Sequence, residues 1–71
     1  MVMILLADGF EELEALAPLD VLRRLEVDTV LVGVSGKNVK GAHGVELTAD
    51  RTLNQLKNET PDMVVDRKSV V

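Results

Sequence analysis

Residues 1–34 read MVMILLADGFEELEALAPLDVLRRLEVDTVLVGV, and the fold class follows from their pattern. Met1–Ala7 is a continuous apolar run without alternation, which is typical of a strand buried on both faces of a parallel sheet. Asp8-Gly9 ends this run. Asp28–Val34 is a second apolar segment rich in β-branched residues, and it predicts a second buried strand.

The segment between these strands, from Glu11 to about Leu25, predicts a helix. Acidic residues gather in its first turn and Arg23-Arg24 in its last, as the helix dipole favours. Pro18 lies in the interior of this segment and predicts one bent helix. A strand, a helix and a strand with short connections form a unit whose two strands are parallel.

The second half of the chain predicts shorter elements. Val45–Ala49 alternates apolar and polar residues, which indicates a half-exposed strand in a hairpin that begins near Val39. Thr52 and Gln55 have the spacing of a capping box, so a short helix to about Asn58 should follow. Asp62–Asp66 begins like another buried strand. The predicted order is strand, helix, strand, strand, strand, helix and strand, which is an α/β fold.

Composition excludes several classes of function. The 71 residues include 12 acidic and 8 basic side chains, a net charge of −4, which argues against nucleic-acid binding. The chain has no cysteine and one histidine, His43, so the sequence predicts neither a metal site nor a cofactor. Its longest apolar run is far below the roughly 18 residues that span a membrane, and no signal-peptide pattern follows it. We therefore expect a cytoplasmic protein without membrane contact.

The densest group of chemically active side chains is DGFEELE, at Asp8–Glu14. It places carboxylates after a buried strand and at the start of a helix, and Glu11 and Glu14 share one helix face. Such carboxylates can act as a general acid or base, or they can be solvated charges that stabilise a helix start. His43 lies in a glycine-rich loop, where it could bind an anion when protonated or remain an ordinary surface residue. Neither common phosphate-loop motif is present, so we interpret the glycines as turn residues.

Four pieces in order resemble the ThiJ/PfpI superfamily, and most closely its parkinsonism-associated deglycase branch with its bacterial relatives. The resemblance extends from about Met3 to Val65, and this family also carries a proline in its first helix. The pieces are ADGFEELE at Ala7–Glu14, APLDVLRR at Ala17–Arg24, VGVSGK at Val32–Lys37 and GAHGVELTAD at Gly41–Asp50.

The resemblance implies a flavodoxin-like three-layer sandwich whose active site pairs a cysteine with a glutamate of the first helix. By position in EELE that glutamate is Glu14, implied to be protonated and hydrogen-bonded to the cysteine thiolate. The match further implies that Gly9 and His43 border the binding pocket. It also implies that Glu11, Leu13 and Arg24 lie in or near a homodimer interface.

The chain departs from the family after the segment that matches the last strand. Relatives continue there into a Leu-Pro-Gly-Gly turn that helps to form an oxyanion hole, whereas Asp66–Val71 reads DRKSVV. Residues 1–71 are thus predicted to be the N-terminal part of one domain, an incomplete flavodoxin-like sandwich truncated before the cysteine. Exposed apolar surface is then expected at Met1–Leu6 and Val30–Val34.

Two functions agree with this resemblance. The chain could be a fragment of a deglycase or glyoxalase that acts on small carbonyls, or of an oxidative-stress or chaperone protein, and is inactive without the cysteine. It could instead be a non-catalytic interaction module that forms a homodimer or binds a full-length family partner. A third interpretation, half of a receiver or nucleotide-binding domain, would use Asp8, but no acidic pair precedes Asp8 and no phosphate loop is present.

Overall fold

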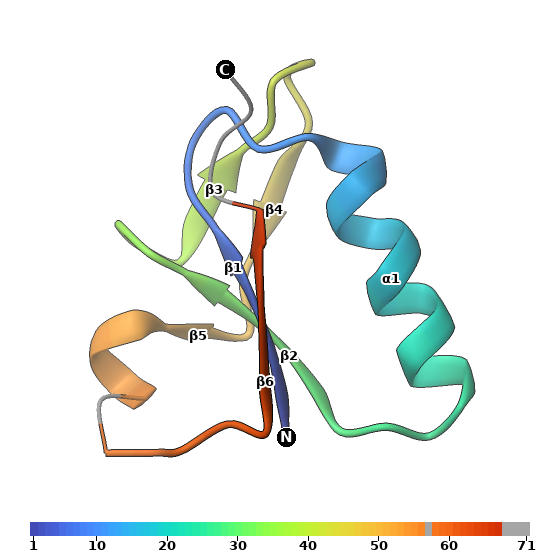
Figure 1. Ribbon diagram of the computed structural model, residues 1–71. Helices are drawn as coiled ribbons and strands as arrows, with labels where there is room; N and C mark the ends of the chain where they lie inside the picture. Colours follow the sequence, from blue (N-terminus) through green and yellow to red (C-terminus); the bar gives the residue numbers. More distant parts are fainter. Residues whose placement is uncertain (57, 68–71) are drawn as a thin grey trace.

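A computed structural model describes residues 1–56 and 58–67 of the chain. Its centre is a four-stranded sheet in the order β5-β2-β1-β6, and a separate antiparallel pair, β3-β4, stands at one end of it (Figure 1). The order of elements confirms the predicted α/β class. The elements are β1 (Val2–Leu6), α1 (Glu12–Arg24), β2 (Thr29–Gly33), β3 (Asn38–Lys40), β4 (Glu46–Thr48), β5 (Arg51–Thr52), the 3-10 helix η1 (Leu53–Leu56) and β6 (Met63–Arg67).

The two predicted apolar strands lie side by side and are parallel. Val2 is aligned with Thr29 and Leu6 with Gly33, so β1 and β2 run in register along their whole length. Strand β6 pairs with the other edge of β1, also in parallel, and the two-residue strand β5 pairs with β2. The sequence did not predict β5, because two residues carry no detectable period.

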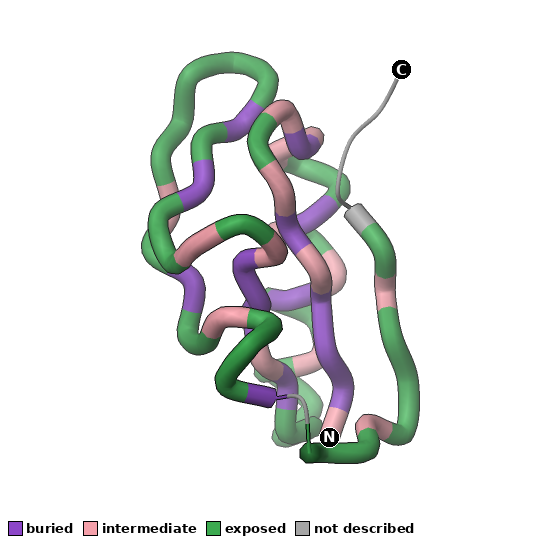
Figure 2. Tube along the Cα trace, turned by 90° about the vertical axis from the view of Figure 1, so that its left-hand side faces the viewer, coloured by how far each residue is buried: buried purple, intermediate pink, exposed green. Residues whose placement is uncertain are grey.

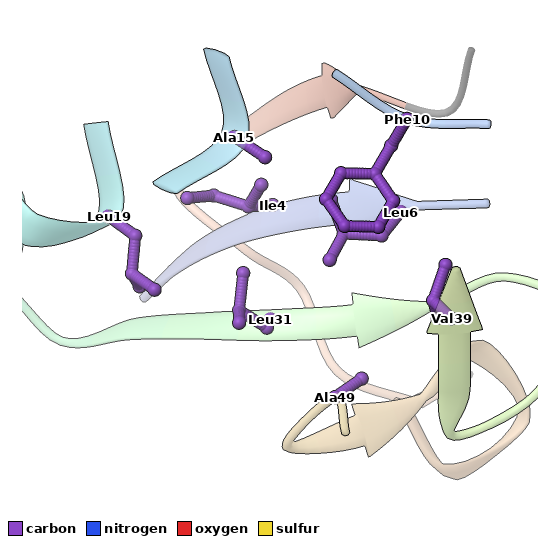
Figure 3. Close-up of a cluster of buried hydrophobic side chains, with 8 residues drawn as sticks. All are labelled: Ile4, Leu6, Phe10, Ala15, Leu19, Leu31, Val39 and Ala49. Atoms are coloured by element: carbon purple, nitrogen blue, oxygen red, sulfur yellow. The ribbon is translucent and has the colours of Figure 1, made fainter. Parts of the chain in front are cut away.

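Helix α1 covers one face of the sheet. It continues through Pro18, and its first and last turns carry the acidic and basic residues that the sequence predicted. Ala15 and Leu19 point from α1 toward Ile4 and Leu31 of the sheet (Figure 3). Beyond them, Phe10, Leu6 and Val39 extend the same apolar cluster toward the end of the sheet where β3 begins.

The opposite face of the sheet is covered by η1, as Figure 1 shows. Leu56 of η1 packs on Met3 and Val32 there. The predicted capping box is present, since the Thr52 amide donates to Gln55 and the Gln55 amide donates to the Thr52 hydroxyl. The described part of the predicted short helix is the 3-10 helix η1 over Leu53–Leu56, and Asn58 lies in a turn.

The predicted surface exposure was wrong in two places. Most of Met1–Leu6 and Val30–Val34 is buried or half-buried, since α1 and η1 together cover both faces of the two inner strands (Figure 2). Strand β6 was expected to be buried, yet Met63 is 57% exposed and Val64 50%. Among the described strands β6 is at the edge of the sheet and has β1 on one side only, which explains the exposure.

The charged residues after Val65 do not end the last strand, because β6 continues through Asp66 to Arg67. The rest of the segment that departs from the family pattern, residues 68–71, lies outside the described residues. No helix within the described part of the chain is long and apolar enough to cross a membrane.

Candidate functional site

The candidate site is built on the loop that leaves β1 and enters α1. In parallel α/β sheets, ligands bind beyond the carboxyl ends of the strands, and this loop starts at such an end. Gly9 has a φ of 89°, a left-handed conformation that favours glycine. Its amide donates to the carbonyl oxygen of Lys40 at 2.8 Å, and the Lys40 amide donates to Asp8 Oδ1 at 3.0 Å. Both loop residues therefore serve to attach β3.

The same loop is attached to the turn between β3 and β4. Phe10 forms an isolated parallel bridge with Gly41, and the Ala42 amide donates to the Phe10 carbonyl oxygen at 2.8 Å. The Phe10 side chain is fully buried beneath this connection, beside Val39. The first turn of α1 and residues 41–45 are consequently held close together.

Glu12 is the first residue of α1, and its carboxylate lies inside the curve of the 41–45 turn. Oε2 accepts hydrogen bonds from the His43 amide at 2.7 Å and the Val45 amide at 3.4 Å. Oε1 lies 2.9 Å from His43 Nδ1. These bonds, above all the one from the His43 ring, lower the pKa of Glu12 to about 2. The group is therefore a carboxylate at any physiological pH.

His43 shows the reciprocal shift. Its hydrogen bond to Glu12 and the negative charges of Glu12 and Glu11 raise the pKa of the imidazole above its ordinary value. The side chain of His43 is 75% exposed, whereas that of Glu12 is 13% exposed. In this pair His43 is the solvent-exposed residue that titrates near neutral pH, and Glu12 is the largely buried residue that stays ionised.

Gly41 makes this close approach possible. A Cβ atom at position 41 would lie 2.5 Å from both Cδ and Oε2 of Glu12. Any larger residue would therefore push the carboxylate out of the turn.

Glu11, Glu12 and His43 bring potential metal ligands within 4.8 Å of one another. Two features make this group a poor cation site. The carboxylate oxygens of Glu12 already accept hydrogen bonds from the turn, and both glutamates stand at the start of α1, where the helix dipole favours negative charge. The arrangement is better suited to holding a loop than to holding an ion.

The other residues that the sequence singled out are not brought together. Glu14 lies on α1 and is exposed, and Leu13 is 79% exposed. Arg24 is at the far end of α1, about 16 Å from Leu13 along the helix axis, and forms an i,i+4 ion pair with Asp20 at 3.0 Å. Glu11 approaches His43 at the N-terminus of the helix. The predicted residues therefore divide into a cluster around His43 and an open face of α1.

Sequence reasoning missed Glu12, which makes the most hydrogen bonds in this region. Its position at the start of a predicted helix indicated a charge that interacts favourably with the helix dipole, but it did not indicate that His43 would be its hydrogen-bond partner. Reasoning from the sequence also missed a cavity at the carboxyl ends of β2 and β5. The residues that line the cavity are Val34, Ser35, Gly36, Thr52, Leu53 and Asn54.

Comparisons with known proteins find similarity over most of the chain. The family model described as the DJ-1/PfpI family matches residues 1–65. The fruit fly protein dj-1beta is 34% identical over 64 residues, and an Arabidopsis thaliana DJ-1 homolog B is 32% identical over 65. The match covers 89% of the chain for the fly protein and 90% for the plant protein, but only 34% and 15% of those two proteins.

Solved structures agree with this match. The crystal structure of Drosophila melanogaster DJ-1beta superposes with a TM-score of 0.91 at 31% identity, over 97% of this chain and 38% of that one. A DJ-1 superfamily protein from Salmonella typhimurium gives a TM-score of 0.87 at 39% identity, over 89% of this chain and 35% of that one. The chain thus spans little more than a third of the length of these neighbours.

Proposed function

The chain belongs to the DJ-1/PfpI family, and we propose that it is a member without catalytic activity of its own. On this proposal residues 1–71 correspond to the N-terminal part of one family domain and retain Glu14, the carboxylate that would pair with a cysteine. The observation that carries the proposal is the absence of cysteine from the 71 residues, which leaves Glu14 without a thiolate to hydrogen-bond. The exposure of Glu14 on α1 supports it, because a carboxylate that pairs with a thiolate is expected to lie in a partly buried site.

The complete site would act on small carbonyl compounds such as glyoxals, or would respond to oxidants through its cysteine. These activities need a nucleophile that can form a covalent bond to the carbonyl carbon or be oxidised. The chain offers no thiol for this role. The chain by itself is therefore expected to show no catalytic turnover of such substrates.

An assay of glyoxal and methylglyoxal consumption by the purified chain tests this proposal. We expect no turnover above that of buffer, with a full-length cysteine-containing relative as the positive control. Turnover that is lost in Glu14→Gln and retained in Glu11→Gln would overturn the proposal. Glu11→Gln is the matched control because it removes the same charge three residues earlier in the chain.

A second candidate function, a non-catalytic dimerisation module, has support from one feature of α1. Leu13, Ala17, Val21 and Leu25 follow one another at four-residue spacing, and all four are exposed. This spacing brings the first three onto one slowly winding stripe of α1, and Leu25 follows at the C-cap of the helix. An exposed apolar stripe is typical of a subunit contact, and a second copy of the chain or a full-length family member would cover it.

Sedimentation of the chain and two variants tests the dimerisation module. Leu13→Asp puts a charge into the stripe and should convert a dimer into a monomer. Leu53→Asp is the matched control, because Leu53 is also an exposed leucine but lies in η1. A monomeric chain, or a dimer that both variants weaken equally, would remove support from α1 as the contact.

A further inference from the structure

The contact between Glu12 and the 41–45 turn has a property that neither proposed function uses. It joins two segments that are 31 residues apart in the sequence, and one side chain makes all three hydrogen bonds. Two of these bonds come from backbone amides, which do not titrate. The third comes from the His43 ring, which does.

We propose that Glu12 and His43 form a pH-dependent lock between the first turn of α1 and the β3–β4 turn. The two backbone amides hold the carboxylate at every physiological pH, and the protonated imidazole tightens the hold. When His43 loses its proton, Nδ1 can no longer donate a charge-assisted hydrogen bond unless the neutral ring adopts the Nδ1–H tautomer. The lock then loosens without opening fully.

The charges around His43 determine the direction of this response. Glu12 and Glu11 on the helix side are negative and favour the imidazolium. On the hairpin, Lys40 and Glu46 are aligned opposite each other and offset one another. Asp8 adds a further negative charge in the loop that binds β3. The net surroundings of the ring are negative, so His43 keeps its proton to higher pH than a free histidine.

The lock also fixes the backbone that carries Glu14. Glu14 follows Glu12 by two residues, within the first turn of α1. The turn at 41–45 and the Phe10–Gly41 bridge hold this part of the helix from one side. Glu12 is accordingly a positioning residue for the helix start, and this inference does not depend on whether Glu14 belongs to a catalytic site.

Proton NMR titration of the chain tests the lock, because His43 is its single histidine and gives one ring signal. The wild-type pKa is expected above the ordinary 6.5. Glu12→Gln should lower it toward that value, since the ring loses its charged partner and the Gln carbonyl oxygen is only a neutral acceptor, while Glu11 remains. Glu11→Gln, which removes an equal charge that makes no hydrogen bond to the ring, should leave the pKa above 6.5.

Amide hydrogen exchange supplies a second reading that does not depend on the ring. The His43 and Val45 amides should be protected in the wild type, and Glu12→Ala should lower their protection at least about tenfold, as expected for loss of a hydrogen bond to a charged group. His43→Ala keeps both amides and Glu12, so their protection should persist but lose its pH dependence between about pH 5 and about pH 9.

Two results would overturn the proposal. One is a wild-type His43 pKa at the value of a free histidine, which includes the case of a chain that does not fold. The other is an equal fall of the His43 pKa in Glu11→Gln and Glu12→Gln. In that case the negative charges at the helix start, rather than the hydrogen bond from His43 to Glu12, would explain the raised pKa.

Discussion

At the scale of single residues, Gly41 and Glu12 depend on each other. Gly41→Ala would bring a methyl group to 2.5 Å from the Glu12 carboxylate, which would have to swing out of the turn and give up its hydrogen bonds. We expect a lower unfolding temperature and a His43 pKa closer to that of a free histidine. Gly36→Ala is the control, since a Cβ at position 36 meets no atom within 4 Å, and it should change the stability by less than about 0.5 kcal/mol.

The titration of the same pair makes the stability depend on pH. The pKa of Glu12 falls from 4.5 to about 2 on folding, so its contribution is present above pH 4.5 and is lost as the pH falls toward about 2. The pKa of His43 rises above 6.5 on folding, so its contribution is complete below pH 6.5 and is lost as the pH rises through the folded value.

Denaturant unfolding of the wild type and of His43→Ala across the pH range checks this sign. The difference in stability between the two proteins should be largest in mildly acidic buffer and should shrink as the pH increases above 6.5. A difference that grows with increasing pH would contradict the geometry of the pair.

At the scale of elements, Asp50 ties the C-terminal end of α1 to β2. Its Oδ2 accepts hydrogen bonds from Arg23 Nη2 at 2.8 Å and from the Leu31 amide at 2.9 Å. The guanidinium of Arg23 also donates to the Thr29 carbonyl oxygen at 3.2 Å. This connection resembles the Glu12 contact at the other end of the helix, since each uses one carboxylate to join two segments.

We expect Asp50→Ala to cost about 1–2 kcal/mol of unfolding free energy, because it leaves the Leu31 amide and Arg23 without this acceptor. Asp20→Ala removes an equally charged residue whose ion pair with Arg24 lies on the helix surface. That variant should cost less than about 0.5 kcal/mol. Equal losses in chemical denaturation would show that Asp50 acts only as a surface charge.

At the scale of the whole molecule, the described fold is compact although the chain spans only 15% to 38% of the length of the relatives compared above. The radius of gyration is 11.2 Å, close to the roughly 11 Å that a compact domain of this length should have. The two faces of the sheet are covered by α1 and by η1, and two apolar clusters result. Large apolar side chains remain exposed on α1 and the segment after it, in the β3–β4 turn, on η1 and on β6.

A chain of this size is expected to have a small free energy of unfolding. A typical value of about 0.1 kcal/mol per residue suggests a total of roughly 7 kcal/mol, and Ile4→Ala should remove about 2–5 kcal/mol of it because Ile4 is fully buried. Leu13→Ala deletes an exposed side chain and should cost less than about 0.5 kcal/mol in the monomer. Thermal unfolding followed by circular dichroism would distinguish them, and similar melting temperatures would contradict the assigned core.

The sequence by itself determined the elements whose signals are local. The apolar runs of β1 and β2, the charge distribution of α1 and the capping box at Thr52 each depend on residues within a few positions of one another. The family resemblance carried by four segments was likewise readable from the sequence, and the family match over residues 1–65 confirms it.

Only the tertiary structure decided which distant residues meet. Glu12 and His43 became partners because a bridge at Phe10 and Gly41 brings the β3–β4 turn against α1, and no local pattern encodes that closure. The exposure of Met63 also depended on the position of β6 in the sheet rather than on its apolar composition. Burial and hydrogen bonding are properties of the space around a residue, and chain neighbours supply only part of that space.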